Sequence, residues 1–451
     1  MDKKTTENRR IVLAILMEAD EGDKLSSLLK NSLDKVDYMD KQDKAFITRL
    51  TKGCIERRIT LDYVIAQYAK TKKLKPVIRN ILRMAIYQIL FMDSVKDFAA
   101  CSEAVNLAKE RGLQGLSSFV NGVLRNIARE KDSIKWPDKT KSYQQYLSVY
   151  YSIPEWLVDY IVKLYGKDKA EAMFDAMDQE SMVTIRVNEE LPSSKIADLI
   201  MFIERSGTKV SKHPYSDYAY SLDDVGGVAG LPGFNEGLFT VQDISSQMVI
   251  NIAGIEKGNL VLDMCAAPGG KTMHAALLAG DEGKVIARDI SDDKISRIED
   301  NADRLGINNV TCEVHDATKL DESMIEKCDV VICDAPCSGL GVMGRKADIR
   351  YNASLDGIKS LAQLQRSIID NAVRYVKKGG ILIYSTCTIT KEENADNRAY
   401  ILEKGMKAAG FDDKVSFLDE KARLMAADGE LQLLPGQHDC DGFYISRYIK
   451  E

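Results

Sequence analysis

The chain has 451 residues, a length that predicts about three domains of ordinary size. Hydrophobic residues make up 45% and charged residues 29%, which excludes a disordered or fibrous chain. No run approaches the roughly 18 consecutive apolar residues of a membrane span, and the charged N-terminus lacks the apolar core of a secretion signal. A cytoplasmic globular protein without membrane association is therefore expected.

Nine cysteines and four histidines bear on redox and metal chemistry. The number of cysteines is odd and no pair has the C-x-x-C spacing of a zinc site, which predicts free thiols in a reducing compartment. The histidines are scattered and form no H-E-x-x-H pattern. No metal site is predicted.

The net charge of −6 is unevenly distributed. Residues 1–140 carry 27 Lys and Arg against 19 Asp and Glu, and the stretch from Lys52 to Arg83 carries nine against two. Phosphate backbones are bound chiefly through such clusters, so one interpretation is an RNA-binding face. The other is a solvated helical surface, and charge alone does not decide between them.

In residues 1–135, apolar residues recur with the helical period and strand-like alternation is weak, which predicts an α-helical first domain. The expected helices are Arg9–Met17, Lys44–Ile55, Leu61–Tyr68, Val77–Phe91, Ala99–Ala108 and Ser118–Ala128. The polar, proline-containing stretch Ser133–Thr140 indicates a linker. Residues 141–235 predict a small α+β domain, with helices at Trp156–Tyr165, Lys169–Met177 and Ser194–Ile203 and a strand at Val183–Val187.

In residues 236–451, apolar strands alternate with helices, which predicts an α/β domain with a mostly parallel, doubly wound sheet. The expected strands are Leu260–Met264, Lys284–Ala287, Val310–Val314, Val330–Cys333 and Ile381–Tyr384, and the clearest helices are Asp292–Leu305 and Gly357–Val376. Ligands of such sheets bind beyond the carboxyl ends of the strands.

The segment from Val261 to Lys271 predicts a strand, a glycine-rich loop and a helix. Gly269 and Gly270 would let the backbone approach a ligand closely. The spacing matches neither the dinucleotide nor the P-loop fingerprint, which disfavours a pyrophosphate and suits the amino-acid moiety of S-adenosylmethionine. Acids follow the first three strands: Asp263, Asp289, expected at the ribose hydroxyls, and Asp316, expected at the adenine.

Two cysteines follow the next two strands, Cys337 and Cys387, whereas Cys54, Cys101, Cys312, Cys328 and Cys333 are expected to be small buried hydrophobes. Thiols suit cytosine methylation, because addition of a thiolate to C6 makes C5 nucleophilic toward the sulfonium methyl. An ordinary thiol is only a few per cent ionised at neutral pH, so a cationic neighbour is expected, and Lys271 is a candidate. The residues alone do not say which thiol attacks.

Asp334 begins the proline–cysteine segment. One interpretation is that its carboxylate binds N3 and the exocyclic amine of cytosine. The other is that it caps the turn at Pro336.

The order of these segments resembles the Nop2/Sun RNA cytosine-5 methyltransferases over residues of about 140–451. The matching motifs are Thr184–Asn188 (TIRVN), Val241–Gln247 (VQDISSQ), Asp263–Lys271 (DMCAAPGGK), Asp334–Gly339 (DAPCSG), Ser385–Cys387 (STC) and Asp441–Phe443 (DGF). Glu103–Leu107 and Phe119–Arg125 resemble a NusB-type RNA-binding helical bundle. This fusion points to the bacterial Sun/Fmu (RsmB-type) branch, with an RRM-like middle domain.

The resemblance implies S-adenosylmethionine-dependent methylation of cytosine C5 in 16S rRNA or a small-subunit precursor, by a monomer. It implies Cys387 as the nucleophile, with Cys337 assisting product release and Asp334 in the catalytic site. The implied cofactor contacts are Cys265, Ala266, Ala267, Pro268, Gly269, Gly270, Lys271, Asp289, Asp316 and Asp334. One departure is Lys346-Ala347-Asp348, where many relatives carry His-Pro-Asp, and it leaves the substrate contacts of that loop open.

Two alternatives remain at this stage. Cys337 could be the nucleophile, as the proline–cysteine thiol is in DNA cytosine methyltransferases. A non-catalytic RNA-binding assembly or antitermination factor would fit the basic helical third, but it predicts a decayed cofactor loop or a lost cysteine, and the sequence keeps both.

Overall fold

The computed structural model describes residues 3–22, 25–36, 38–71, 73–179, 182–223, 225 and 227–451. By their internal contacts, they form two compact units. The helical unit comprises Met1–Asp178 and Arg345–Asn352, and the sheet unit comprises Gln179–Gly344 and Ala353–Glu451. The boundaries expected from the sequence, 1–135, 141–235 and 236–451, stay a prediction. No helix among the described residues is long and apolar enough to cross a bilayer.

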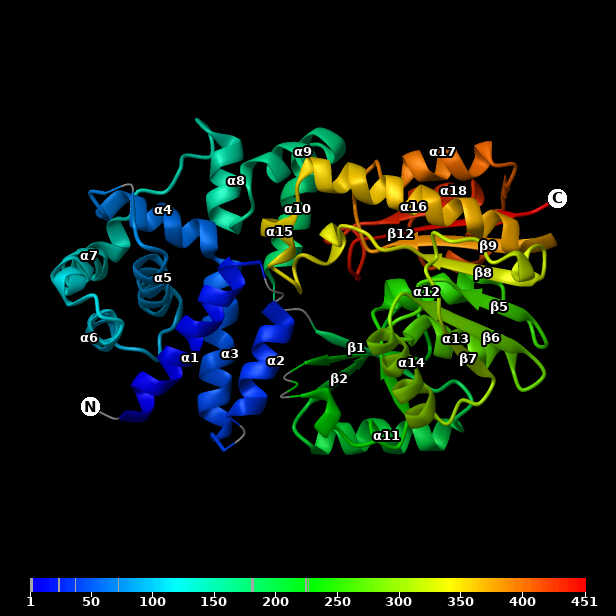
Figure 1. Cartoon of the computed structure of the whole chain (residues 1–451), viewed down its shortest axis with the longest axis horizontal. Helices are drawn as coiled ribbons and strands as arrows, with labels where there is room; N and C mark the ends of the chain where they lie inside the picture. Colours follow the sequence, from blue (N-terminus) through cyan, green and yellow to red (C-terminus); the bar gives the residue numbers. More distant parts are fainter. Residues whose placement is uncertain are drawn as a thin grey trace. The chain divides into compact units, whose positions relative to one another are not determined.

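Seven helices form the first part of the helical unit (Figure 1). They are α1 (Lys3–Asp20), α2 (Leu25–Lys35), α3 (Lys41–Glu56), α4 (Arg58–Tyr68), α5 (Pro76–Phe91), α6 (Asp97–Glu110) and α7 (Ser117–Glu130). All six predicted helices are confirmed. Helix α2 was not predicted, because the only side chains that it buries, Leu25, Leu28 and Leu29, are set among polar residues.

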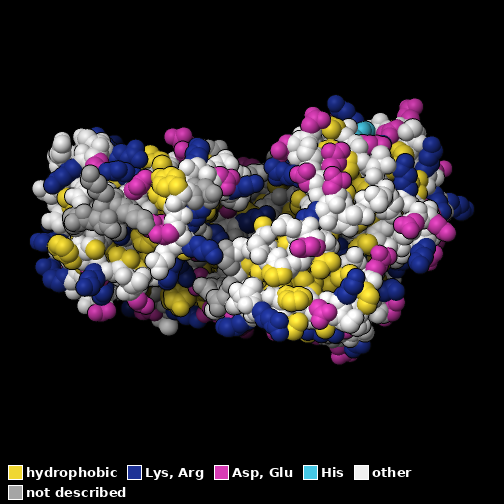
Figure 2. Space-filling view, turned by 90° about the horizontal axis from the view of Figure 1, so that it is seen from below, with side chains coloured by type: hydrophobic (Ala, Val, Ile, Leu, Met, Phe, Trp, Pro, Cys, Tyr) yellow, Lys and Arg dark blue, Asp and Glu magenta, His cyan; other side chains and the backbone are white. Residues whose placement is uncertain are grey.

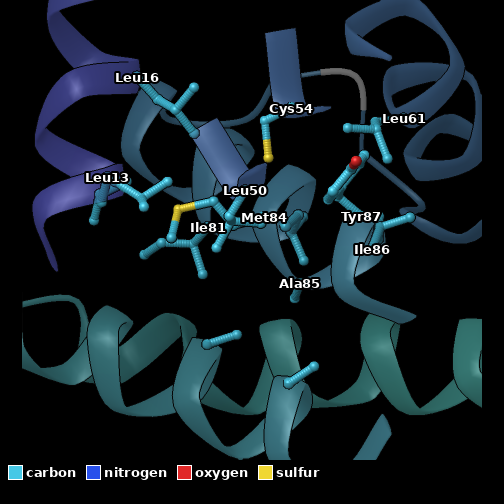
Figure 3. Packing of buried hydrophobic residues seen from close by; sticks show 14 of the residues in the cluster. Leu13, Leu16, Leu50, Cys54, Leu61, Ile81, Met84, Ala85, Ile86 and Tyr87 are labelled. Carbon is cyan, nitrogen blue, oxygen red and sulfur yellow. The ribbon is translucent and has the colours of Figure 1, made fainter. Parts of the chain in front are cut away.

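Helix α5 forms the centre of this core, where Ile81 and Ile86 are fully buried (Figure 3). Pro76 occupies its first turn, where the missing N–H leaves no hydrogen bond unmade. Helix α3 packs closely against it: a Cβ on Gly53 would lie 1.9 Å from the Tyr87 ring. This close approach accounts for the glycine inside a helix.

Three further helices belong to the helical unit: α8 (Tyr143–Tyr151), α9 (Glu155–Tyr165) and α10 (Lys167–Asp178). Helices α9 and α10 match the predicted ones, and α8 was not predicted. Within this unit, α8 packs against α4.

The segment Arg345–Asn352, which ends in the short helix α15 (Ile349–Asn352), packs into the same helical core. Ala347 is buried there, and Asp348 Oδ2 accepts a hydrogen bond from Leu25 N at 3.3 Å. Arg350 Nη1 donates to Tyr151 O at 3.0 Å. Of the two positions that depart from the family pattern, Ala347 therefore contributes to packing of the helical unit, whereas Lys346 is exposed.

Part of the basic stretch noted in the sequence is neutralised internally. Arg83 is only 3% exposed and pairs with Asp62 at 2.6 Å, and Arg57 pairs with Asp178 at 2.8 Å. Side chains of both signs are interspersed over the face shown in Figure 2. The described basic residues of that stretch that are exposed are Lys52, Lys70, Lys73 and Lys75.

The sheet unit begins with a small antiparallel sheet in the order β2-β3-β1-β4. Its strands are β1 (Val183–Val187), β2 (Lys209–Lys212), β3 (Ala219–Asp223) and β4 (Phe239–Val241), with helix α11 (Ser193–Arg205) between β1 and β2. Ile185, Leu199 and Phe239 are buried in its core. The predicted strand and helix in this segment are confirmed.

The large sheet has the order β10-β12-β9-β8-β5-β6-β7, with β11 paired to β12. Its strands are β5 (Leu260–Asp263), β6 (Lys284–Asp289), β7 (Val310–Val314), β8 (Cys328–Asp334), β9 (Val376–Thr386), β10 (Lys407–Ala408), β11 (Glu430–Leu433) and β12 (Phe443–Ile449). Strands β5 to β9 pair in parallel, whereas β12 is antiparallel to β9. The predicted mostly parallel sheet is confirmed.

Helices cover both faces of this sheet (Figure 1). Helices α12 (Ile244–Ala253), α13 (Gly270–Ala279), α14 (Asp292–Leu305) and α18 (Glu420–Ala427) lie on one side, and α16 (Leu355–Tyr375) and α17 (Ala395–Glu403) on the other. Side chains alternate along β8: Val330 and Ile332 face the first layer, and Val331 and Cys333 the second. Strand β5 lies between β6 and β8, so the chain order reverses there and a ligand crevice is expected at its carboxyl end.

The Arg83 ion pairs lead to a stability prediction. We expect Arg83→Met to lower the free energy of unfolding by about 2–3 kcal/mol, because Asp62 and Asp20 lose a buried cationic partner. Hydrogen exchange of α4 and α5 should quicken correspondingly. Lys52→Met, at an exposed position, is the control and should change stability by less than about 0.5 kcal/mol. Unchanged exchange in Arg83→Met would contradict this account.

Candidate active site

The loop between β5 and α13 has the tight geometry that its glycines suggested. Gly269 has φ +102°, a left-handed conformation, and a Cβ there would lie 3.3 Å from Ile298 Cγ2. Gly269 N donates to Ala266 O at 2.7 Å, and Ala266 N donates to Arg288 O at 2.9 Å. The first of these bonds closes a tight turn within the loop, and the second attaches the loop to β6.

This loop borders a cavity of about 200 Å³ at the carboxyl end of β5. The predicted site residues that line it are Cys265, Ala266, Ala267, Pro268, Gly270, Lys271 and Asp334. The structure therefore brings together residues from the glycine-rich loop and from the end of β8, although they are far apart in sequence.

Further lining residues had no role assigned from the sequence: Val241, Gln242, Asp243, Ser246 and Asp263. Four of them lie on the segment from β4 into α12. Asp243 caps α12 by accepting from Ser245 N at 3.0 Å, and Ser246 Oγ accepts from Lys271 Nζ at 3.2 Å. The signal in the sequence was the VQDISSQ motif, but a motif match alone does not show which wall of a cavity it forms.

Asp263 is a buried acid with an incomplete set of hydrogen bonds. Its Oδ2 accepts from Thr272 Oγ1 at 2.7 Å, whereas no donor among the described residues reaches Oδ1. Burial raises the pKa of Asp263 to about 7. A cationic ligand group in the cavity would supply the missing partner.

The acids after β6 and β7 are held by local contacts. Asp289 Oδ2 accepts from Ala267 N at 2.9 Å, and its Oδ1 accepts from Ile290 N and Lys294 Nζ. Asp289 therefore braces the glycine-rich loop.

Asp316 accepts from both the backbone N and the hydroxyl of Thr318, which lowers the pKa of this carboxyl. Neither Asp289 nor Asp316 is among the described residues that line the cavity. Their roles toward a cofactor stay predictions.

Cys337 and Cys387 follow β8 and β9, which pair in parallel with Asp334 opposite Ser385. This register places the two Sγ atoms 3.3 Å apart. The contact with the Cys387 thiol, together with burial, raises the pKa of Cys337 far above its usual value. The two thiols are therefore close enough to share a hydrogen bond.

The cavity wall contains a charged pair, Lys271 and Asp334. Lys271 Nζ lies 2.7 Å from Asp334 Oδ2, and Ser385 Oγ donates to Asp334 Oδ1 at 2.7 Å. Burial works against the charge of Lys271, but Asp334 and Cys387 outweigh it and raise the pKa of the ammonium. The side chain of Asp334 binds these two side chains, and the described residues show no capping bond from it to the turn at Pro336.

Comparison with known proteins identifies the family. The 16S rRNA methyltransferase RsmB/F family matches residues 251–449. A Bacillus subtilis (strain 168) protein named probable ribosomal RNA small subunit methyltransferase B is 36% identical, over 99% of this chain and 100% of the relative. The chain belongs to the ribosomal RNA small subunit methyltransferase B family. A member from Enterobacter sp. (strain 638) is 30% identical over 99% of both chains.

The other parts of this methyltransferase match as well. The NusB family matches residues 6–129, and a ferredoxin-like domain of RsmF/B-like methyltransferases matches residues 153–229. The crystal structure of PH0851 superposes with a TM-score of 0.82 at 26% identity over 99% of both chains. NSun6 from Pyrococcus horikoshii, solved with SFG, gives a TM-score of 0.59 at 24% identity over 66% of this chain and 98% of that one, a likeness of fold. The family and fold expected from the motifs are confirmed.

The protein is therefore an S-adenosylmethionine-dependent rRNA methyltransferase. The residues of the cavity fit this cofactor, because the buried Asp263 Oδ1 lacks a donor and would accept one from a cationic amino group. Among the described residues, no group of three or more His, Cys, Asp and Glu side chains is arranged to hold a metal ion.

The raised pKa of Asp263 gives a pH-dependent prediction. Because the folded state holds this proton more tightly than the unfolded chain, stability is full below about pH 4 and is lost as pH rises through about 7. The free energy of unfolding of the wild type should therefore fall relative to Asp263→Asn across this window, by up to about 4 kcal/mol. Urea titrations of both proteins without cofactor at several pH values measure this difference. Parallel pH curves would contradict the burial argument.

Proposed function

We propose that this rRNA methyltransferase transfers its methyl group to C5 of a cytosine in 16S rRNA, with Cys387 Sγ bonded transiently to C6 of the base. The observation that carries the proposal is the pair of thiols, 3.3 Å apart, next to the charged Lys271–Asp334 pair. The substrate is the RNA itself or a small-subunit precursor that contains it.

The chemistry explains the need for a thiol. Thiolate addition to C6 moves electron density of the C5–C6 double bond to C5, which then acts as the methyl acceptor. S-adenosylmethionine, when bound, supplies the methyl group as an electrophile. Loss of the C5 proton to a base and expulsion of the Cys387 thiolate restore the double bond. The protein must therefore favour a thiolate first and accept a proton later.

The charges at the site favour Cys387 as the attacking thiol. Against the effect of burial, Asp334 and, to a smaller degree, the Cys387 thiolate raise the pKa of Lys271, so the ammonium in turn stabilises an anion on Cys387. Cys337, whose pKa is raised by its partner thiol and by burial, keeps its proton. We assign to Cys337 the step that assists release of the methylated product.

Asp334 is proposed to contact N3 and the exocyclic amine of the base. Lys271 and Ser385 hold its carboxylate in place, and a carboxylate accepts about four hydrogen bonds in all. Capacity for a base edge therefore remains.

The proposed cofactor contacts are the loop residues Cys265–Lys271 together with Asp289, Asp316 and Asp334. The exposed lysines of the helical unit, Lys70, Lys73 and Lys75, are proposed to contact RNA phosphates. A non-catalytic RNA-binding factor is disfavoured by membership of a methyltransferase family and by the intact cavity and thiol pair.

The two thiols can be tested separately with RNA that carries 5-fluorocytosine. Fluorine at C5 cannot leave as a proton does, so the methylated covalent complex persists. We expect Cys387→Ala to form no complex, and Cys337→Ala to form it and to retain it on ordinary cytosine RNA as well. Denaturing electrophoresis of the protein–RNA complex is the measurement. A persistent complex with Cys387→Ala would assign the attack to Cys337.

The nucleotide is tested by bisulfite sequencing of 16S rRNA from a strain that lacks the gene. We expect one methylcytosine to disappear and to return when the wild-type gene is restored, but not with Cys387→Ala. An unchanged methylcytosine pattern would argue against cytosine C5 as the target.

A further inference from the structure

Glu393 is a fully buried acid between β9 and α17, for which neither the sequence motifs nor the reaction requires a role. Four donors converge on its carboxylate: Ser338 N at 2.8 Å, Ser338 Oγ at 2.5 Å, Thr390 Oγ1 at 2.6 Å and Gln365 Nε2 at 3.0 Å. Each oxygen accepts two of them, as an ionised carboxylate does, and all four donors are uncharged.

Three of these donors come from the two cysteine loops, and Gln365 lies on α16. Ser338 directly follows Cys337, and Thr390 lies shortly after Cys387. A direct bond also links the loops, because Ser338 Oγ lies 2.7 Å from Thr388 Oγ1. The carboxylate of Glu393 therefore binds the chain shortly after each of the two cysteines.

A second layer of contacts fixes Glu393 itself. Gln365 Nε2 also donates to Pro336 O at 2.9 Å, so the residue before Cys337 is held from the same side. Tyr384 OH donates to the backbone O of Glu393 at 2.7 Å, and Asn397 Nδ2 donates to the same atom at 3.2 Å. Side chains from β9, α16 and α17 thus determine where the carboxylate lies.

We propose that Glu393 is a positioning residue that holds the Cys337 loop against the Cys387 loop and thereby determines which of the two thiols attacks the base. The identity of the base in this assignment rests on the proposed function. The protonation state of the two thiols does not depend on it.

The charge of Glu393, and not only its shape, enters the argument. A buried carboxylate is costly to desolvate, and an amide would satisfy several of the same donors at lower cost. The retained negative charge lies next to Cys337 and disfavours a second anion there. The Lys271 ammonium acts on Cys387 in the opposite sense, with Asp334 as its counter-charge. Thus a cation acts on Cys387 and an anion acts on Cys337.

The direct test is alkylation of the two thiols by iodoacetamide without RNA, followed by peptide mapping. In the wild type, we expect Cys387 to react at least about tenfold faster than Cys337 near neutral pH, since the thiolate is the reactive form. In Glu393→Gln, which keeps the shape and removes the charge, the ratio should fall by about threefold or more. An unchanged ratio in this variant would overturn the proposal.

Two further variants separate charge from general damage. Glu393→Asp keeps the carboxylate and should keep the direction of the preference, whereas a loss equal to that of Glu393→Gln would overturn the role of charge. Glu403→Gln removes an exposed carboxylate from α17 and should leave the ratio unchanged. Binding of S-adenosylmethionine by calorimetry, within about twofold of the wild type, verifies folding. If Glu393→Gln does not fold, Glu393→Asp and Ser338→Ala are compared instead. Glu393→Asp displaces the carboxylate, whereas Ser338→Ala leaves it in place and removes one of its hydrogen-bond donors. An alkylation ratio that is unaltered in both variants would contradict the positioning role.

Trapping with 5-fluorocytosine RNA separates this inference from the proposed function. Slower complex formation in Glu393→Gln, partly restored in Glu393→Asp, is expected. If the wild type forms no complex but alkylation changes as described, the proposed reaction fails and the role of Glu393 in ordering the thiols stands. If the wild type forms the complex and neither readout responds to Glu393→Gln, the inference fails alone.

Discussion

The parallel pairing of β8 with β9 is the constraint on which the rest of the site depends. It sets Asp334 opposite Ser385, and both strands end at the same edge of the sheet. Cys337 and Cys387 follow those ends, and their sulfur atoms lie 3.3 Å apart. A slip of one residue in this register would displace one thiol relative to the other by about 3.3 Å along the strands.

Around this edge, the charges are arranged in a fixed order. Lys271 and Asp334 form a partly exposed pair that lines the cavity, and the Glu393 carboxylate accepts a hydrogen bond from Ser338 N, directly after Cys337. A partly exposed ion pair contributes little net stability, so its place in the cavity wall points to a task in chemistry. That task, in our proposal, is to keep the thiolate on Cys387 and the proton on Cys337.

The helical unit is made in part from a segment distant in sequence. The chain continues from the Cys337 loop into Arg345–Asn352, and Ala347 is buried among the helices. Ala347, which replaces the proline that many relatives carry there, thus contributes to the packing of that core. The charge count of the N-terminal third likewise overstates the number of exposed basic side chains, because Arg57 and Arg83 form ion pairs and only some lysines are exposed.

The sequence by itself determined the class of sheet, the strands that carry the acids and cysteines, and the pair of candidate thiols, because period and strand-end chemistry are local properties. It missed α2, whose buried leucines are set among polar residues, and α8, a short helix of 9 residues, and it left open whether Asp334 caps a turn. Only the tertiary structure decided that Ser246 and Asp263 share a cavity with Lys271, and that Glu393 joins two loops. Those facts depend on which strands become neighbours, and a side-chain contact between distant segments leaves no periodic trace in the chain.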